Sequence, residues 1–313
     1  MGEVFREVFR KKKGGFFMRP VQILTDSCSD LMKDLREQYG IDYARMNTVY
    51  NGEEKQASLD FEYYTPKQLY DIMRAGNRIL TTQVPPVEFE RIFTEYLEKG
   101  CNIVYIGCST KQSSSVFTGE KVAKDLAAKY PGAEIYCVDS LNASIGEGML
   151  AVRAAKYRNE GLSAKEIYEK VMGDRKKVNQ FVTVHNLNAL KRAGRVKGSA
   201  AFFGNLLGVK PILIADANGN QVPVKKVKGR QNSLNELVAL LKEVYDDPEG
   251  EVYLTHADCD PEEVEAVCAM IKKELTCKNI HIGYIGPIIG ASIGPSAIGI
   301  WGFGKEVTYT FEG

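Results

Sequence analysis

A hydroxyl-rich stretch, Tyr105-Ile-Gly-Cys-Ser-Thr-Lys-Gln-Ser-Ser-Ser115, is the part of this 313-residue chain whose residue types best suit a chemical task. It follows a β-branched run at 102–106 and precedes a helical pattern of apolar residues, so it joins a predicted strand to a predicted helix. Free backbone N–H groups and the positive end of the helix dipole meet at such a junction, and hydroxyls add further donors. The stretch therefore suits a carboxylate or a phosphate. Helix capping by Ser113 or Ser114 is the competing interpretation, because serines often cap helices.

Two other predicted strands also end in polar turns, at Asp26-Ser27 and at Asp139-Ser140, and each turn precedes a helix. Alternation of strands and helices predicts a parallel sheet, whose strand carboxyl ends gather at one edge and form the usual ligand crevice. We expect Asp26, Ser27, Asp139 and Ser115 to face this crevice or a partner protein.

The fold predicted from these patterns is α/β with two domains. Residues 18–173 read as a parallel-sheet α/β domain, and residues 174–313 mix hairpins with helices, which is typical of an α+β domain with a mixed sheet. Residues 1–17 form an N-terminal extension. We expect the ligand to lie between the two domains.

Two segments raise the question of a membrane. Residues 1–17 place apolar side chains on one helical face beside a basic cluster, so transient contact with a membrane surface is one interpretation and a loose tail is the other. Residues 282–304 carry no charge, but glycines and prolines divide them into strands and turns rather than one spanning helix. We expect no transmembrane segment.

The composition favours an ordinary globular protein of the cytoplasm. Lys plus Arg total 41 against 40 acidic residues, so no overall field favours nucleic acid. The 7 cysteines include no C-x-x-C pair, and the 3 histidines show no metal-ligand spacing. We therefore expect reduced cysteines that pack in the core, with neither a bound metal nor a cofactor.

Recognised catalytic motifs do not fit their required contexts. Gly290-Ala-Ser-Ile-Gly294 has the spacing of a nucleophile elbow around Ser292, but no histidine follows it and Pro295 interrupts the helix that an elbow needs. No phosphate-binding P-loop is present in the sequence either. The remaining candidates for acid or base chemistry are Asp26 and Asp139, although an aspartate at a strand–helix junction more often caps the helix.

Two classes of function therefore remain open. One is a non-catalytic carrier that binds a carboxylate without transforming it. The other is an enzyme that acts on a small carboxylate or phosphorylated metabolite, with Asp26 or Asp139 as general base. A carrier of an acyl chain needs an apolar tunnel, whereas such an enzyme needs a short polar pocket.

Several segments, taken together and in order, resemble the DegV family of bacterial fatty acid-binding proteins. Each corresponds to a family motif: Leu24-Thr-Asp-Ser27, Thr81-Thr-Gln-Val-Pro-Pro86, Ser109-Thr-Lys-Gln-Ser-Ser-Ser115, Val138-Asp-Ser-Leu-Asn-Ala-Ser-Ile-Gly146, the segment from Leu187 to Val196, and Val209-Lys-Pro-Ile-Leu213.

The resemblance implies a two-domain α/β carrier that buries one acyl chain between its domains and holds the carboxylate with hydroxyls. Thr81, with Thr82 beside it, and Ser113, with Ser114 beside it, occupy the positions of that role. It also implies that a separate ATP-dependent fatty acid kinase phosphorylates the bound carboxylate for phospholipid synthesis. Arg195 lies in the segment that the resemblance places near the ligand mouth or the partner surface.

One departure concerns the head group. The family turn I-G-x-H-x-G-P-G is similar to Ile289-Gly-Ala-Ser-Ile-Gly-Pro-Ser296, and Ser292 stands where the family has a histidine. A serine still donates one hydrogen bond, but it is not a titratable donor at neutral pH. We therefore include Ser292 among the carboxylate-binding residues.

Overall fold

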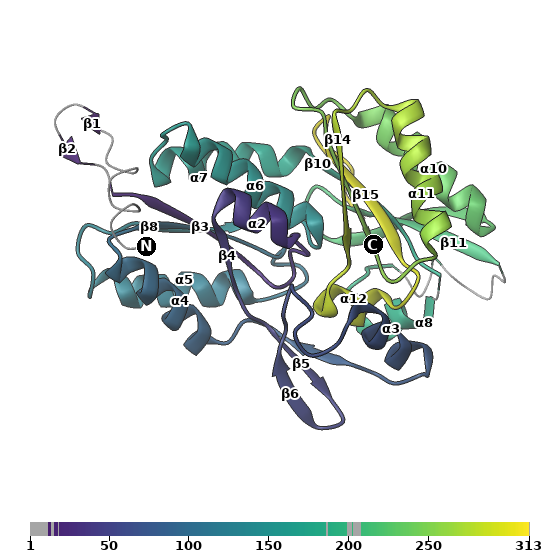
Figure 1. The fold of residues 1–313 in the computed structure, drawn as a ribbon, viewed down its shortest axis with the longest axis horizontal. Coiled ribbons are helices and arrows are strands. Elements are labelled where there is room, and N and C mark those ends of the chain that lie inside the picture. The colour runs from purple at the N-terminus through teal and green to yellow at the C-terminus, as the bar shows by residue number, and fades with distance from the viewer. Residues whose placement is uncertain are drawn as a thin grey trace.

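A computed structural model describes residues 12–13, 16–17, 19–185, 187–198, 202 and 208–312. It is an α/β protein with a parallel four-stranded sheet and a mixed six-stranded sheet, each flanked by helices (Figure 1). The α/β prediction is confirmed. No helix of the described residues is long and apolar enough to cross a membrane.

The parallel sheet has the strand order β4-β3-β8-β9. Its strands are β3 (Val21–Asp26), β4 (Ile41–Ala44), β8 (Asn102–Gly107) and β9 (Ile135–Asp139). The helices beside it are α2 (Lys33–Tyr39), α4 (Pro86–Glu98), α5 (Ser115–Ala127), α6 (Ile145–Asn159) and α7 (Ala164–Asp174). Both faces of the sheet are covered, as expected for parallel strands.

The alternation of side chains along β8 explains how this sheet carries two cores. Ile103 and Tyr105 pack in one buried cluster with Phe89 of α4. Val104 and Ile106, which point to the opposite face, pack in the cluster that includes residues of α6 and α7. An entirely apolar strand therefore lies between two helical layers, with α4 and α5 on one side and α2, α6 and α7 on the other (Figure 1).

A smaller antiparallel sheet follows β4. It consists of β5 (Asn47–Tyr50), β6 (Glu53–Gln56) and β7 (Leu80–Thr82), with β5 in the middle. Asn51-Gly52, a residue pair typical of type I′ hairpin turns, joins β5 to β6, and both residues have the positive φ values that this turn requires, 51° and 79°. A capping box at Thr65 begins α3 (Pro66–Arg74).

The mixed sheet has the strand order β12-β11-β10-β15-β13-β14, and only β13 and β14 pair in parallel. Its strands are β10 (Val178–Thr183), β11 (Val209–Ala215), β12 (Gln221–Lys228), β13 (Glu251–His256), β14 (Asn279–Tyr284) and β15 (Ile298–Phe303). The helices here are η1 (Arg175–Lys177), α8 (Leu187–Ala193), α10 (Arg230–Val244), α11 (Pro261–Glu274) and α12 (Pro287–Ile293).

Helix α6 lies between the two large sheets and contacts strands of both. One buried cluster accordingly joins Ile23 of the parallel sheet, Leu150 of α6 and Trp301 of the mixed sheet. The parallel strands all precede residue 174 and the mixed-sheet strands all follow it. The predicted domain boundary at residue 173 stays a prediction, because the two large sheets share this buried cluster.

The interpretation of residues 282–304 as strands and turns is incomplete. The segment also contains the short helix α12. Gly290 lies inside this helix, at a position where a Cβ would come within 2.6 Å of the Tyr70 hydroxyl oxygen, so Tyr70 packs directly against it.

The N-terminal extension is described only at β1 (Lys12–Lys13) and β2 (Phe16–Phe17), which pair antiparallel. The predicted membrane-facing helical face of residues 1–17 otherwise lies outside the described residues.

Candidate functional site

The strand ends of the parallel sheet meet the small sheet and α12 at a polar pocket of about 330 Å³. The pocket lining includes Thr81 and Thr82 from β7, Ser113 and Ser114 from the β8–α5 loop, and Ser292 from α12. The tertiary structure thus brings together five hydroxyls from three segments that are far apart in the sequence.

Most of these hydroxyls have no hydrogen-bond partner among the residues that the structure describes. Among the described residues, none donates to or accepts from the side chains of Thr81, Thr82, Ser114 and Ser292. Ser113 is different, since its Oγ lies 2.9 Å from the Ser115 Oγ and accepts the Ser115 N–H at 3.2 Å. The pocket therefore presents unpaired donors to whatever occupies it.

The capping interpretation fails for Ser114, which is the N-cap residue of α5 but whose side chain accepts no hydrogen bond from the first turn. Ser113 does satisfy an N–H of that turn, because its Oγ accepts the N–H of Ser115, the first residue of α5. Ser115 is fully buried and accepts the Val84 N–H on its Oγ at 3.2 Å, so it ties the loop to the segment after β7. Ser115 thus orients Ser113 through their hydrogen bonds. The expectation that Ser115 faces the crevice is not met, because its side chain is buried.

An apolar cavity of about 60 Å³ adjoins the hydroxyl pocket and shares Gln112, Arg195, Ile289 and Ser292 with it. Its other walls are mostly aliphatic and aromatic residues of α8, the mixed sheet and the segments beside them: Val182, Leu190, Val196, Leu213, Ile285, Ile293 and Trp301. A polar mouth that adjoins an apolar interior suits an amphipathic ligand.

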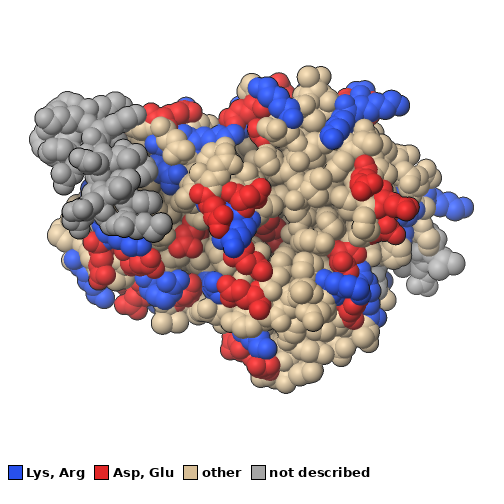
Figure 2. Space-filling view, viewed as in Figure 1, with Lys and Arg blue, Asp and Glu red and all other residues tan. Residues whose placement is uncertain are grey.

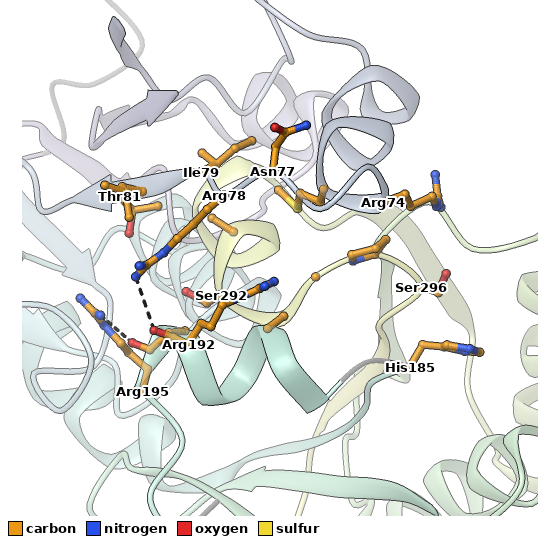
Figure 3. Close-up of a pocket in the computed structure, with 17 residues that line it drawn as sticks. Arg74, Asn77, Arg78, Ile79, Thr81, His185, Arg192, Arg195, Ser292 and Ser296 are labelled. Carbon is orange, nitrogen blue, oxygen red and sulfur yellow. Dashed lines mark hydrogen bonds between the residues drawn. The ribbon is translucent and has the colours of Figure 1, made fainter. Parts of the chain in front are cut away.

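On another side, the hydroxyl pocket meets a basic hollow of about 400 Å³, with which it shares Thr81, Arg195 and Ser292. Arg78 and Arg192 also line this hollow, and in Figure 3 the Arg78 side chain extends toward the side on which Arg195 lies, whereas the Arg192 side chain runs in the opposite direction. Their backbone contacts are Arg78 Nη2 to the Arg192 carbonyl at 3.5 Å and Arg195 Nη1 to the Ala193 carbonyl at 2.7 Å.

These exposed arginines contrast with the rest of the visible surface. Lys and Arg are interspersed with Asp and Glu over the face drawn in Figure 2, and Arg74 in the same hollow pairs with Asp71 and Asp258. Arg78, Arg192 and Arg195 form no ion pair within the described part of the chain. They leave positive charge available to an anion at the pocket mouth.

Asp26 and Ser27 do not face the crevice, contrary to expectation. Both are fully buried beneath the pocket. Asp26 accepts hydrogen bonds from the Tyr105 hydroxyl at 2.7 Å and from the backbone N–H groups of Cys28 at 2.8 Å and Cys108 at 3.3 Å. Ser27 Oγ accepts the Met46 N–H at 2.8 Å. Their polar atoms hold the strand-end loops together.

Burial is the main cause of the pKa shifts of the acidic residues beneath the pocket, which are Asp26, Asp30 and Glu147. Loss of water raises the pKa of Asp26 to about 6, although its hydrogen bonds act in the opposite direction. The pKa of Asp30 rises to about 7 for the same reason. Burial and the neighbouring Asp26 also raise the pKa of Glu147 well above its ordinary value.

Neither aspartate of the enzyme hypothesis is placed to act as a general base on a pocket ligand. Asp26 is enclosed, and its oxygens are occupied. Asp139 accepts from the Thr110 hydroxyl at 2.5 Å and the Leu141 N–H at 2.9 Å, and it does not line the hydroxyl pocket. A general base must reach the proton that it removes, and these contacts direct both carboxylates elsewhere.

Several pocket residues escaped the sequence analysis. Gln83, Lys111 and Gln112 line the pocket and directly adjoin its hydroxyl residues in the chain, so their proximity was the available signal. Cys28 and Cys108 also line it, 80 positions apart, and no local spacing pattern marks such a pair.

Comparisons with known proteins agree with this architecture. The family model described as "Uncharacterised protein, DegV family" matches residues 20–304. A DegV domain-containing protein from Clostridium perfringens is 33% identical over 288 residues, which cover 92% of this chain and 98% of the relative.

Solved structures of similar chains share the fold. A DegV family protein from Thermus thermophilus superposes with a TM-score of 0.81 at 26% identity, covering 92% of this chain and 100% of the other. DegV from Bacillus subtilis gives a TM-score of 0.78 at 25% identity, covering 91% and 99%. With a family model that spans nearly the whole chain and a relative at 33% identity, this protein belongs to the DegV family.

Proposed function

We propose that this protein is a non-catalytic carrier of one long-chain fatty acid. The carboxylate binds the hydroxyls of Thr81, Thr82, Ser113, Ser114 and Ser292, and the tail enters the adjoining apolar cavity. The observation that carries the proposal is the convergence of these hydroxyls, most of them unpaired, on a pocket that adjoins an apolar interior.

Hydrogen bonding explains why several hydroxyls are needed. A carboxylate loses its water on entering a crevice, and the loss is offset only if several donors replace that water. Hydrogen bonds to a charged group contribute about 1.5–3 kcal/mol each. The N-terminus of the 13-residue helix α5 begins beside Ser114 and adds a favourable dipole.

The relatives support the same assignment. The Thermus thermophilus structure is described as showing fatty acid binding by a DegV family protein, and the Bacillus subtilis protein is described as a fatty acid binding protein. The two structures cover 92% and 91% of this chain.

The proposed partner is a separate ATP-dependent fatty acid kinase, which phosphorylates the carboxylate for phospholipid synthesis. The exposed side of the pocket is compatible with this step. Arg78, Arg192 and Arg195 line the hollow that adjoins the pocket, where they attract an anionic head group and the phosphate that would be added to it. The carrier itself supplies no phosphate-binding loop.

Native mass spectrometry of the full chain purified from a bacterial host tests the proposal. We expect an added mass of one acyl chain per protein, which solvent extraction removes and added fatty acid restores. Recovery of protein with no acyl chain that also fails to bind added palmitate or oleate would overturn the assignment.

A second measurement separates the carrier from the enzyme. Protein loaded with fatty acid and incubated with ATP and Mg²⁺ should return the fatty acid unchanged, and acyl phosphate should form only after a fatty acid kinase is added. Turnover by the carrier alone would contradict the non-catalytic assignment while leaving fatty acid binding intact.

A further inference from the structure

Directly beneath the hydroxyl pocket, three buried side chains with metal-binding atoms meet. Cys28 follows β3, Cys108 follows β8, and Glu147 lies in the first turn of α6. The two Sγ atoms and a Glu147 carboxylate oxygen all lie within 4.8 Å of one another. The three residues are each at most 2% exposed.

Glu147 has a carboxylate oxygen without a partner. Its Oε1 accepts the Thr25 hydroxyl at 2.7 Å and the Asp26 N–H at 3.4 Å. Its Oε2 is buried and has no hydrogen-bond partner within the described residues. An unsatisfied carboxylate oxygen in a water-free interior costs free energy, and a bound cation removes that cost.

The cysteines are held in place by their backbones. The Asp26 carboxylate accepts the N–H of Cys28 on Oδ1 and the N–H of Cys108 on Oδ2, so one side chain clamps both loops. The Tyr105 hydroxyl holds the same Oδ2 at 2.7 Å. Asp26 is therefore a positioning residue for the two thiols, as outer-shell carboxylates are in metal sites.

We propose that Cys28, Cys108 and Glu147 bind one zinc-class divalent ion. Two thiolates and one carboxylate are ligands that Zn²⁺ accepts, at about 2.3 Å for sulfur and about 2.0–2.2 Å for oxygen. Such bond lengths place neighbouring ligand atoms within about 4 Å of each other, so binding draws the three side chains together by at most about 1 Å. Binding releases the two thiol protons to solvent.

Three protein ligands leave the fourth position of a tetrahedral ion open. Cys28 and Cys108 both line the hydroxyl pocket, so the fourth ligand would come from that pocket. Water or an anionic oxygen in that pocket completes the coordination. The ion site stands independently of the proposed fatty acid, because water alone can fill this position.

Cobalt substitution of the reduced, delipidated full chain tests the site. After treatment with a chelator and its removal, we expect the protein to bind one Co²⁺ per chain, with a thiolate-to-cobalt absorption band that added Zn²⁺ abolishes. Glu147→Gln keeps the shape of the side chain but removes its ability to become a carboxylate ligand. It should weaken Co²⁺ binding by at least about tenfold, the effect that even outer-shell changes produce.

Cysteine variants complete the test. Cys28→Ser and Cys108→Ser should each weaken Co²⁺ binding and diminish the thiolate band, and the double variant should lose the band entirely. Cys268→Ser is the matched control, because Cys268 is a buried cysteine on α11, which packs in a different core cluster. Circular dichroism verifies folding, and Glu147→Gln keeps the test valid if the double variant does not fold.

Two results would overturn the site. One is a reduced wild-type protein that takes up no more Co²⁺ than the Glu147→Gln variant. The other is a thiolate band that persists in the double cysteine variant. A Cys28–Cys108 disulfide in protein purified without reductant, combined with no Co²⁺ uptake after reduction, would instead assign the pair to redox chemistry. Fatty acid binding is measured separately, so its failure does not bear on the ion.

Discussion

The hydroxyl pocket and the acidic layer beneath it are built from the same loops but offer opposite chemistry. Ser114 and Thr82 are exposed and unpaired, whereas Asp26 lies completely buried with its oxygens occupied by Tyr105 and backbone N–H groups. Exposure to water decides which role each polar side chain has. Polar atoms at the surface remain free to exchange water for a ligand, while those one layer below stabilise the backbone that presents them.

The largest effect expected from this contrast concerns Asp30, whose Oδ2 accepts the Ser144 hydroxyl at 2.5 Å and whose Oδ1 accepts the Gly286 N–H at 2.8 Å. Its folded pKa of about 7 lies above the ordinary value of 3.8. The folded protein therefore holds this proton more tightly. The associated stability is present below pH 4 and is lost as the pH rises through 7.

Asp30→Asn should flatten that pH dependence. Asparagine can accept the Gly286 N–H on its oxygen and donate from its nitrogen to the Ser144 hydroxyl oxygen, and it tolerates the φ of 49° at this position. About 4 kcal/mol of the wild-type loss in unfolding free energy between pH 4 and pH 7.5 should disappear. Urea unfolding across this range, with a chelator present so that no ion occupies the cysteine cluster, measures it. Equal pH slopes for both proteins would contradict the buried-acid assignment.

Ser113→Ala tests the exposed half of the comparison. Loss of one charge-assisted hydrogen bond should weaken fatty acid binding by about 1.5–3 kcal/mol, measured by displacement of a fluorescent fatty acid. Thr308→Ala, which removes an exposed hydroxyl outside the pocket, is the matched control and should bind like the wild type. Unchanged affinity in Ser113→Ala would remove this serine from the carboxylate site.

Tyr105→Phe removes a hydroxyl from the buried half instead. The Asp26 carboxyl loses its 2.7 Å hydrogen bond while the ring keeps its edge contact with Phe89. The free energy of unfolding should fall by about 1–2 kcal/mol, with fatty acid affinity close to that of the wild type. A large loss of affinity without a loss of stability would show that the two layers do not divide their roles in this way.

Arg195→Gln should give the smallest effect. Arg195 is exposed at the pocket mouth, and exposed charges contribute about 0.2–1 kcal/mol. Its contribution to fatty acid affinity should disappear as salt is added, because the screening length falls below 10 Å above about 0.1 M. Titrations at low and high salt measure this difference. A loss that persists at high salt would indicate a direct, desolvated contact with the carboxylate.

Local sequence patterns predicted most of this fold. Capping boxes at Thr65 and Ser163, the Asn51-Gly52 turn and the β-branched strands depend on neighbours in the chain, so their structures follow from short-range physics. Helix α12 was missed because its glycines resemble turn signals. Gly290 is needed there only because Tyr70, from a distant helix, packs against it.

Local sequence patterns also predicted part of the candidate site. Thr81, Ser113 and Ser292 were named individually, and the parallel sheet indicated that strand-end turns would converge. The sequence did not predict which of these hydroxyls lack a hydrogen-bond partner. That outcome depends on the Val84 N–H donating to Ser115 and on α12 placing Ser292 in the same pocket as β7. Such contacts join residues that share no pattern in the chain.

Residue types and their order therefore determined the α/β class, the family and the hydroxyl chemistry of the Tyr105–Ser115 stretch, since these depend on periodicity and local bonding. Only the tertiary packing decided which polar side chains are buried. It enclosed Asp26 while leaving Ser114 exposed, and it brought Cys28 and Cys108 together across 80 positions of sequence. The physical reason is that desolvation depends on every neighbouring atom, and those neighbours come from strands that only the folded chain places side by side.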